Sequence, residues 1–203
     1  YITSGARAEL LVPAQNKDWH ARVQGAPRYW STNHLLGKGY WVWLIPLSTG
    51  YTSVGIVADE SVHPFKEYST YEAARAWLRR HEPRLDSFIG ARPCLDFKRL
   101  RRFSYSSRQV FSGDRWACVG EAGFFLDPFY SPGSDFIAFG NSMVTRMIEL
   151  DFEGRFDSRA ADAFNQVLLT LNDNTADIYR GNYPFFGTTQ VMTAKLLWDW
   201  VVY

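Results

Sequence analysis

Residues 116–133 read WACVGEAGFFLDPFYSPG, and this stretch decides how the rest of the chain is interpreted. The apolar run over 116–119 predicts a buried strand. Gly120 and Glu121 place a tight turn and an acid at its end, and a proline-rich loop then ends at Gly133, where a helical pattern begins. We therefore expect one carboxylate and several free backbone N–H groups at the same end of a sheet.

This arrangement suits a nucleotide-like cofactor with a polyol arm. A carboxylate can accept from sugar or polyol hydroxyls, a helix start favours an anionic or electron-rich group, and glycines let a flat ring approach the backbone. Ligands of sheet-and-helix folds bind in such crevices. An alternative stays open at this point, because short glycine motifs are weak evidence of function. Glu121 then only caps a turn, and Pro132 with Gly133 only stiffens a connector.

The composition excludes several classes of function. Lys and Arg number 22 against 21 Asp and Glu, a formal net charge of +1, which predicts no electrostatic surface for nucleic acid. Cys94 and Cys118 form no CxxC pair and the histidines lack metal-ligand spacing, so we predict neither a disulfide framework nor a metal site. No apolar run is long enough for a membrane span and no signal-peptide pattern opens the sequence. We expect a cytoplasmic protein.

The first half of the chain predicts strands. Residues 40–58 hold two apolar runs joined by a short loop at 48–50, which is typical of a β-hairpin. The first run lacks clean alternation, so it should be an interior strand that is covered on both faces. Residues 95–111 alternate enough to suggest further strands before the turn SGDR at 112–115.

Four helices are also predicted, one before residue 116 and three after Gly133. The first has a capping box of Ser69 and Glu72 and stops at Pro83. The others are a helix capped by Gly133 or Ser134, a helix that ends at Gly181, and a helix from Val191 onward.

Two motifs of the sequence resemble those of flavin-dependent halogenases and their monooxygenase relatives. VGEAGFFLDPFYSPG, at 119–133, resembles the Gly-Asp-Ala…Asp-Pro…Ser-Gly segment of their FAD-binding domain, and WVWLIP, at 41–46, fits their Trp-x-Trp-x-Ile-Pro signature. The likeness extends over residues 28–203, and the two motifs together are far more specific than either alone. It implies a mixed α/β, or α+β, FAD/NAD(P)-binding flavoprotein fold, of which this chain is the C-terminal part.

The resemblance also divides the chain and assigns its residues. It implies a substrate-side antiparallel sheet with a connecting helix over 1–112, the closing strand and helix of the FAD-binding domain over 113–150, and a helical C-terminal region over 151–203. The implied cofactor-binding residues are Gly120, Glu121, Asp127, Pro128, Pro132, Gly133 and Ser134. Gly133 and Ser134 are also the implied halide donors, and Trp41, Trp43, Ile45 and Pro46 the implied barrier between flavin and substrate.

Within the resemblance, Glu121 faces the ribityl hydroxyls, Asp127 and Pro128 lie against the pyrimidine side of the ring, and the helix start faces its N1–C2=O edge. A core role for the two tryptophans is compatible with a barrier role, because residues two apart on a strand share a face.

Three departures from the family pattern qualify the resemblance. The Gly-x-Gly-x-x-Gly fingerprint and the catalytic lysine are absent and are expected upstream of Tyr1, so the catalytic residue is unknown. Tyr130 stands where tryptophan halogenases have a catalytic glutamate. Pro132 occupies a position whose backbone N–H helps to bind halide in the family, and proline has no N–H.

The sequence therefore predicts an FAD-dependent oxidoreductase that uses reduced flavin and O₂ to halogenate an aromatic or similar small organic substrate. Its partners would be that substrate, a flavin reductase or other electron donor, and a halide, with no nucleic acid. The alternatives are a monooxygenase without halide use, a flavin-dependent reductase, and a non-catalytic flavin-fold binding protein. We expect this chain to be inactive by itself.

Overall fold

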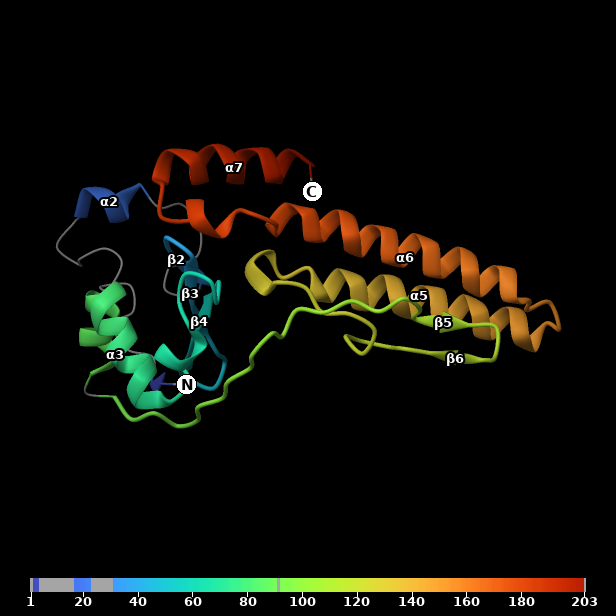
Figure 1. The fold of residues 1–203 in the computed structure, drawn as a ribbon, viewed down its shortest axis with the longest axis horizontal. Helices are drawn as coiled ribbons and strands as arrows, with labels where there is room; N and C mark the ends of the chain where they lie inside the picture. Colours follow the sequence, from blue (N-terminus) through green and yellow to red (C-terminus); the bar gives the residue numbers. More distant parts are fainter. Residues whose placement is uncertain (1, 4–16, 23–30, 91, 203) are drawn as a thin grey trace. The chain divides into compact units, whose positions relative to one another are not determined.

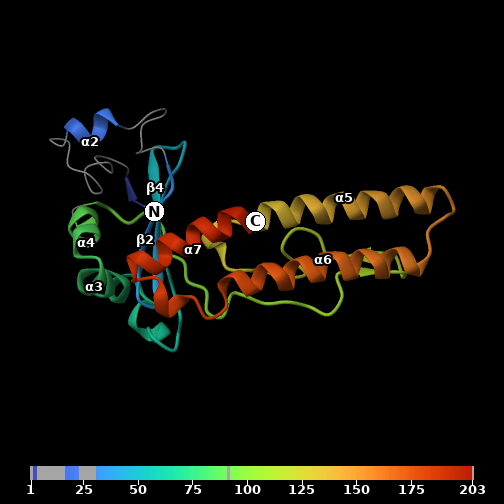
Figure 2. The same cartoon turned by 90° about the horizontal axis from the view of Figure 1, so that it is seen from above.

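The computed structural model describes residues 2–3, 17–22, 31–90 and 92–202 (Figures 1 and 2). The chain forms two compact units. Unit 1 consists of Tyr1–Arg99 with Asn182–Tyr203, and unit 2 consists of Leu100–Gly181. None of the helices in the described ranges is long and apolar enough to cross a membrane.

A four-stranded antiparallel sheet forms the centre of unit 1. In spatial order its strands are β1 (Ile2–Thr3), β4 (Tyr51–Ala58), β3 (Tyr40–Pro46) and β2 (Asn33–Gly37). The predicted hairpin is confirmed as β3 and β4, and its turn contains Gly50 with a φ of 79°, a left-handed conformation that glycine adopts without strain. β3 lies between two neighbours, as its unbroken apolar run predicts.

Two helices cover one face of this sheet. Helix α3 (Tyr71–His81) and helix α4 (Pro83–Ile89) supply the apolar residues that pack on it. The buried cluster consists of Tyr40, Val42 and Leu44 from β3 with Trp77, Leu78, Leu85 and Ile89 from the helices. Because side chains alternate along a strand, Trp41 and Trp43 lie on the opposite face.

The predicted helix start at Ser69 is displaced by one residue. Thr70 is the N-cap of α3, and its Oγ1 accepts from the N–H of Ala73 at 3.2 Å. The Ser69 hydroxyl donates to the Lys66 carbonyl instead. Pro83 ends α3 as predicted and also occupies the first turn of α4, where a missing N–H costs nothing.

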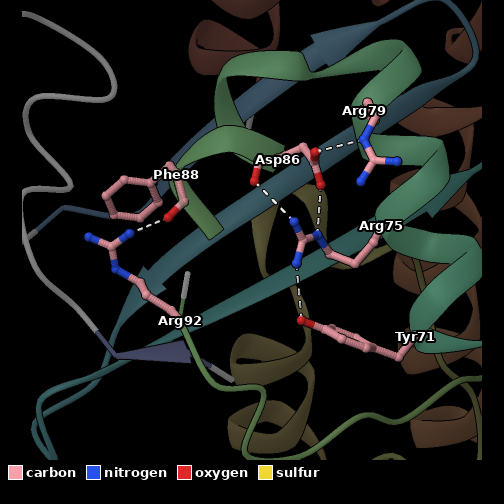
Figure 3. A network of polar contacts seen from close by, with 6 residues as sticks. All are labelled: Tyr71, Arg75, Arg79, Asp86, Phe88 and Arg92. Atoms are coloured by element: carbon pink, nitrogen blue, oxygen red, sulfur yellow. Dashed lines mark hydrogen bonds and ion pairs between the residues drawn. The ribbon is translucent and has the colours of Figure 1, made fainter. Parts of the chain in front are cut away.

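An ion-pair network fastens α4 to α3 (Figure 3). Asp86 of α4 is buried, and Arg75 Nε donates to its Oδ1 at 2.7 Å while Arg79 Nε donates to Oδ2 at 3.2 Å. Arg75 also reaches the Tyr71 hydroxyl at 3.3 Å. Both oxygens of the Asp86 carboxylate are thus paired with cations, as a buried carboxylate requires.

In its described residues, unit 1 also contains α2 (Lys17–Ala21), the 3₁₀ turns η2 (Phe65–Glu67) and η4 (Tyr183–Phe185), and α7 (Thr189–Val202). The 3₁₀ turn η4 (Tyr183–Phe185) precedes α7, which begins two residues before the predicted Val191. Tyr183 contacts the turn between β2 and β3, since its carbonyl accepts from Gly39 N–H at 2.8 Å.

Unit 2 is built on two long antiparallel helices that lie side by side in Figures 1 and 2, α5 (Gly133–Phe152) and α6 (Ser158–Tyr179). The N-cap of α5 is Pro132 and not Gly133 or Ser134, because the proline carbonyl already accepts from the N–H groups of Asp135 and Phe136. Gly181, with a φ of 70°, follows the end of α6 as predicted.

The strands expected in unit 2 are shorter than the sequence suggests. Only β5 (Phe111–Ser112), β6 (Trp116–Ala117) and an isolated bridge between Tyr105 and Phe125 form in the described part of this unit. The strand predicted over 116–119 is confirmed only at Trp116–Ala117, and the prediction that it is buried is wrong, since Trp116 is 45% and Val119 is 54% exposed. Residues 95–104 form no strand either, because they have no ladder partner among the described residues.

A buried amide binds backbone groups at β5 that its partner strand β6 does not pair. Asn165 of α6 accepts from the N–H groups of Val110 and Phe111 at 2.8 and 2.9 Å through its Oδ1. Its Nδ2 donates to the Phe111 carbonyl at 2.6 Å. The helix thus satisfies the polar backbone of this edge, as burial demands.

Candidate functional site

A pocket of about 240 Å³ lies in unit 2 at the start of α5. The glycine turn, the loop of the 3₁₀ turn η3 (Pro128–Tyr130) and the first turn of the helix form its wall. The structure brings six of the seven predicted cofactor residues to this wall, which are Gly120, Glu121, Pro128, Pro132, Gly133 and Ser134.

The Glu121 carboxylate lies beside the first residue of α5. A Cβ atom built on Gly133 would be 2.5 Å from Glu121 Oε1, far closer than a non-bonded contact allows. The N–H groups of Gly133 and Ser134 belong to the first helical turn, which has no preceding carbonyl four residues back within the helix. The acceptor oxygen and the positive end of the helix dipole are therefore neighbours.

Two residues with positive φ shape the loop around the pocket. Gly120 has a φ of 63° and carries the turn that presents Glu121. Ser131 has a φ of 58° although it is not glycine, and its N–H donates to the Pro128 carbonyl at 3.0 Å. Such left-handed residues are over-represented at ligand sites, where the surrounding structure stabilises them.

Pro132 is buried in the wall and begins the helix with its carbonyl. That carbonyl accepts from the N–H groups of Asp135 and Phe136, both at 3.1 Å. A proline has no N–H to turn toward an anion in the pocket. The donors left at this helix start are the N–H groups of Gly133 and Ser134.

The seventh predicted cofactor residue, Asp127, does not line the pocket. Its Oδ1 accepts from Phe129 N–H at 2.9 Å, so this buried carboxylate caps η3. The sequence indicates an Asp-Pro turn here but not the direction of the side chain. A contact between Asp127 and a flavin ring stays a prediction.

Sequence reasoning missed three hydroxyls that hold the Glu121 loop. Ser104 Oγ donates to the Phe125 carbonyl at 3.1 Å, Tyr105 Oη donates to the Glu121 carbonyl, and Ser107 Oγ donates to the Gly123 carbonyl. The only signal in the sequence is the hydroxyl-rich tetrapeptide SYSS at 104–107. Its pairing with a loop 16 or more residues away requires the fold.

The predicted barrier residues Trp41 and Trp43 lie on one face of β3 in unit 1, with ring centroids 5.6 Å apart. We call this pair the tryptophan wall. Trp41 is 1% exposed and donates from Nε1 to the Tyr183 hydroxyl at 3.0 Å, while Trp43 donates to Ser53 Oγ at 3.0 Å. Ile45 follows on the same face and Pro46 faces the other side.

A histidine adjoins the tryptophan wall. The His34 ring meets Trp41 edge to face with centroids 4.9 Å apart, and burial lowers the pKa of its imidazole. Trp41 therefore has the surroundings of a core residue, which is compatible with the sequence. The action of the tryptophan wall as a barrier stays a prediction.

The division of the chain into the regions 1–112, 113–150 and 151–203 also stays a prediction.

No protein-family model matches the chain. The flavin-dependent halogenase chlA of Dictyostelium discoideum is 24% identical over 174 residues, which cover 84% of this chain and 29% of that protein. The 1H-pyrrole-2-carbonyl-(peptidyl-carrier protein) brominase of Pseudoalteromonas luteoviolacea is 35% identical over 174 residues, which cover 84% of this chain and 38% of that protein.

Among solved structures, the flavin-dependent brominase Bmp2 is similar with a TM-score of 0.67 and 28% identity, over 89% of this chain and 46% of that one. The chain thus spans less than half the length of these relatives. The mixed helix-and-sheet flavoprotein fold predicted from the sequence is confirmed, and FAD is the cofactor of the related halogenases. The chain is related to the flavin-dependent halogenases over the C-terminal portion of their fold.

Proposed function

We propose that this chain supplies the polyol and helix-start side of an FAD site in an enzyme that halogenates an aromatic or similar organic substrate with reduced flavin and O₂. The main support is the pocket at the start of α5, which gathers Glu121 and the helix start in one place. The names of two relatives support the reaction class, since one is a flavin-dependent halogenase and the other a brominase of a pyrrole-2-carbonyl group on a peptidyl-carrier protein.

The residues of the pocket fit a flavin. Glu121 offers acceptor oxygens for polyol hydroxyls, and a Cβ at Gly133 would fill the space beside that carboxylate. Phe124 and Phe136, whose rings meet edge to face at 5.1 Å, give the pocket an apolar side. When bound in its reduced form, the flavin would supply the electrons that reduce O₂.

Each group of this chain has a defined task in the proposal. Glu121 holds a hydroxyl of the polyol arm and thereby sets the depth of the flavin. The N–H groups of Gly133 and Ser134 stabilise negative charge at the adjacent edge of the ring, since a helix start favours anions.

A second candidate function is oxygenation without halide, and Pro132 favours it. Loss of one backbone donor to a charged group costs about 1.5–3 kcal/mol, which is about a ten- to hundredfold loss of halide affinity. The Glu121 carboxylate beside Gly133 adds a like charge near the same position. Gly133 and Ser134 can still donate, so halide use stays the first candidate.

The test supplies the full-length protein with FAD, a flavin reductase, NADH and O₂, and reads the products by mass spectrometry. The substrates are phenols, indoles, pyrroles and a pyrrole-2-carbonyl carrier-protein thioester, each with and without bromide. Brominated product supports halogenation, and a Pro132→Ala variant should then use bromide at about tenfold lower concentration. Halide-independent oxygen insertion would move the protein to the monooxygenases. Absence of flavin binding would overturn both candidates.

A further inference from the structure

We infer that Tyr105 is a positioning residue that holds Glu121 in place for the cofactor. The inference rests on the proposed function and extends it to a residue outside the pocket wall. Its basis is the Tyr105 hydroxyl, which donates to the main-chain carbonyl of Glu121 itself.

Tyr105 contacts the Glu121 loop at both of its ends. Its N–H donates to the Phe125 carbonyl at 3.0 Å, and its carbonyl accepts from Phe125 N–H at 2.9 Å. From that fixed point its side chain reaches four residues back to Glu121. One residue therefore fixes the length and direction of the segment 121–125.

The three hydroxyls of this stretch bind the loop through its main chain. The carbonyls of three alternate residues, 121, 123 and 125, each accept from a hydroxyl, of Tyr105, Ser107 and Ser104 respectively. These contacts leave the Glu121 side chain available to the pocket, where its Oε1 lies beside Gly133. Gly120 precedes and Gly123 follows the pair Glu121 and Ala122, so the turn has little stiffness of its own.

The hydroxyl-rich stretch is in turn anchored to helix α6. Asn172, which is 1% exposed, donates to Ser106 Oγ at 3.2 Å. A few residues after this stretch, Val110 and Phe111 donate from their backbone N–H groups to Asn165 of the same helix. Tyr105 therefore belongs to a stretch that is anchored to helix α6 and that also binds the loop carrying Glu121. A group that binds a ligand at a defined position needs such support from a regular element.

The experiment is a double-mutant cycle in the full-length protein, with FAD dissociation constants from flavin fluorescence and melting temperatures of the apo forms. Tyr105→Phe removes only the hydroxyl and should weaken FAD by about two- to tenfold. Glu121→Ala should weaken FAD by about five- to hundredfold. In the Glu121→Ala background, Tyr105→Phe should add less than about a twofold loss, because its effect passes through the carboxylate.

Ser104→Ala is the matched control, since it removes a hydroxyl from the same stretch but not from the Glu121 carbonyl. It should lower the apo melting temperature about as much as Tyr105→Phe and leave FAD affinity within about twofold. Unchanged affinity in Tyr105→Phe, an equal loss in Ser104→Ala, or full additivity with Glu121→Ala would each overturn the positioning role alone. Unchanged FAD affinity in Glu121→Ala would overturn the proposed role of Glu121 and this inference together.

Discussion

At the scale of single residues, Gly133 and Glu121 form the closest functional contact of the pocket. Gly133 does not have a positive φ, so its backbone conformation does not require glycine. The Glu121 carboxylate requires it, because that group occupies the space that an added Cβ would need. A larger residue would therefore fold here but would displace the end of a flexible acidic side chain.

Gly133→Ala should weaken FAD binding by about tenfold with little change in melting temperature, because the methyl group moves the Glu121 carboxylate. The matched control is Gly140→Ala in the same helix, where an added Cβ would meet only Leu168 Cδ2 at 4.0 Å. That change should stabilise the protein by about 0.5–1 kcal/mol and leave FAD affinity unaltered. Equal FAD affinities in the two variants would contradict this account of the pocket.

The residue types of the pocket could be predicted from the sequence, and their surroundings could not. Glu121 and Gly133 lie at a predicted turn and a predicted helix start, so their proximity follows from local order along the chain. The direction of Asp127 and the hydroxyl of Tyr105 depend on contacts between segments that spacing does not specify.

At the scale of elements, prediction succeeded where periodicity was long and failed where pairing was needed. The hairpin 40–58 and helices α5 and α6 have sustained patterns and appear at the expected places. Residues 95–111 alternate equally well, yet a strand forms only where a partner offers its backbone. The cap of α3 moved from Ser69 to Thr70 because both residue types can accept the same N–H bonds.

The junction of α3 and α4 depends on the Asp86 network of Figure 3. Asp86→Ala should lower the free energy of unfolding by about 3 kcal/mol, because it leaves the guanidinium of Arg75, 17% exposed, without its carboxylate. Denaturant unfolding measures the loss. Asp151→Ala removes the exposed partner of Arg115 and should cost less than about 1 kcal/mol. Similar losses in both variants would show that burial does not strengthen the network.

At the scale of the whole molecule, we propose that the tryptophan wall and the pocket at the start of α5 act in the same reaction, as the resemblance implies. Trp43→Ala should change the product distribution or increase peroxide release at unaltered FAD affinity, which product analysis and a peroxide assay measure. Trp41→Ala should instead destabilise the fold by about 3–5 kcal/mol, because its ring is fully buried and bonded to Tyr183.

The conservative change Trp43→Phe is the control, since it keeps an aromatic ring over Gly55. Peroxide release that stays at the wild-type level in Trp43→Ala would limit the tryptophan wall to a packing role. Loss of folding in both alanine variants would lead to the same conclusion.

The amide of Asn165 has a consequence for how this sequence can diverge. The amide accepts hydrogen bonds from two backbone N–H groups and donates one to a carbonyl. Neither aspartate nor leucine, which have nearly the same shape, can make all three hydrogen bonds. Aspartate would direct a second anionic oxygen at the Phe111 carbonyl, and leucine would leave three buried backbone groups without partners. A descendant that changes this position must therefore also rebuild residues 110–111, and the two segments can only evolve together.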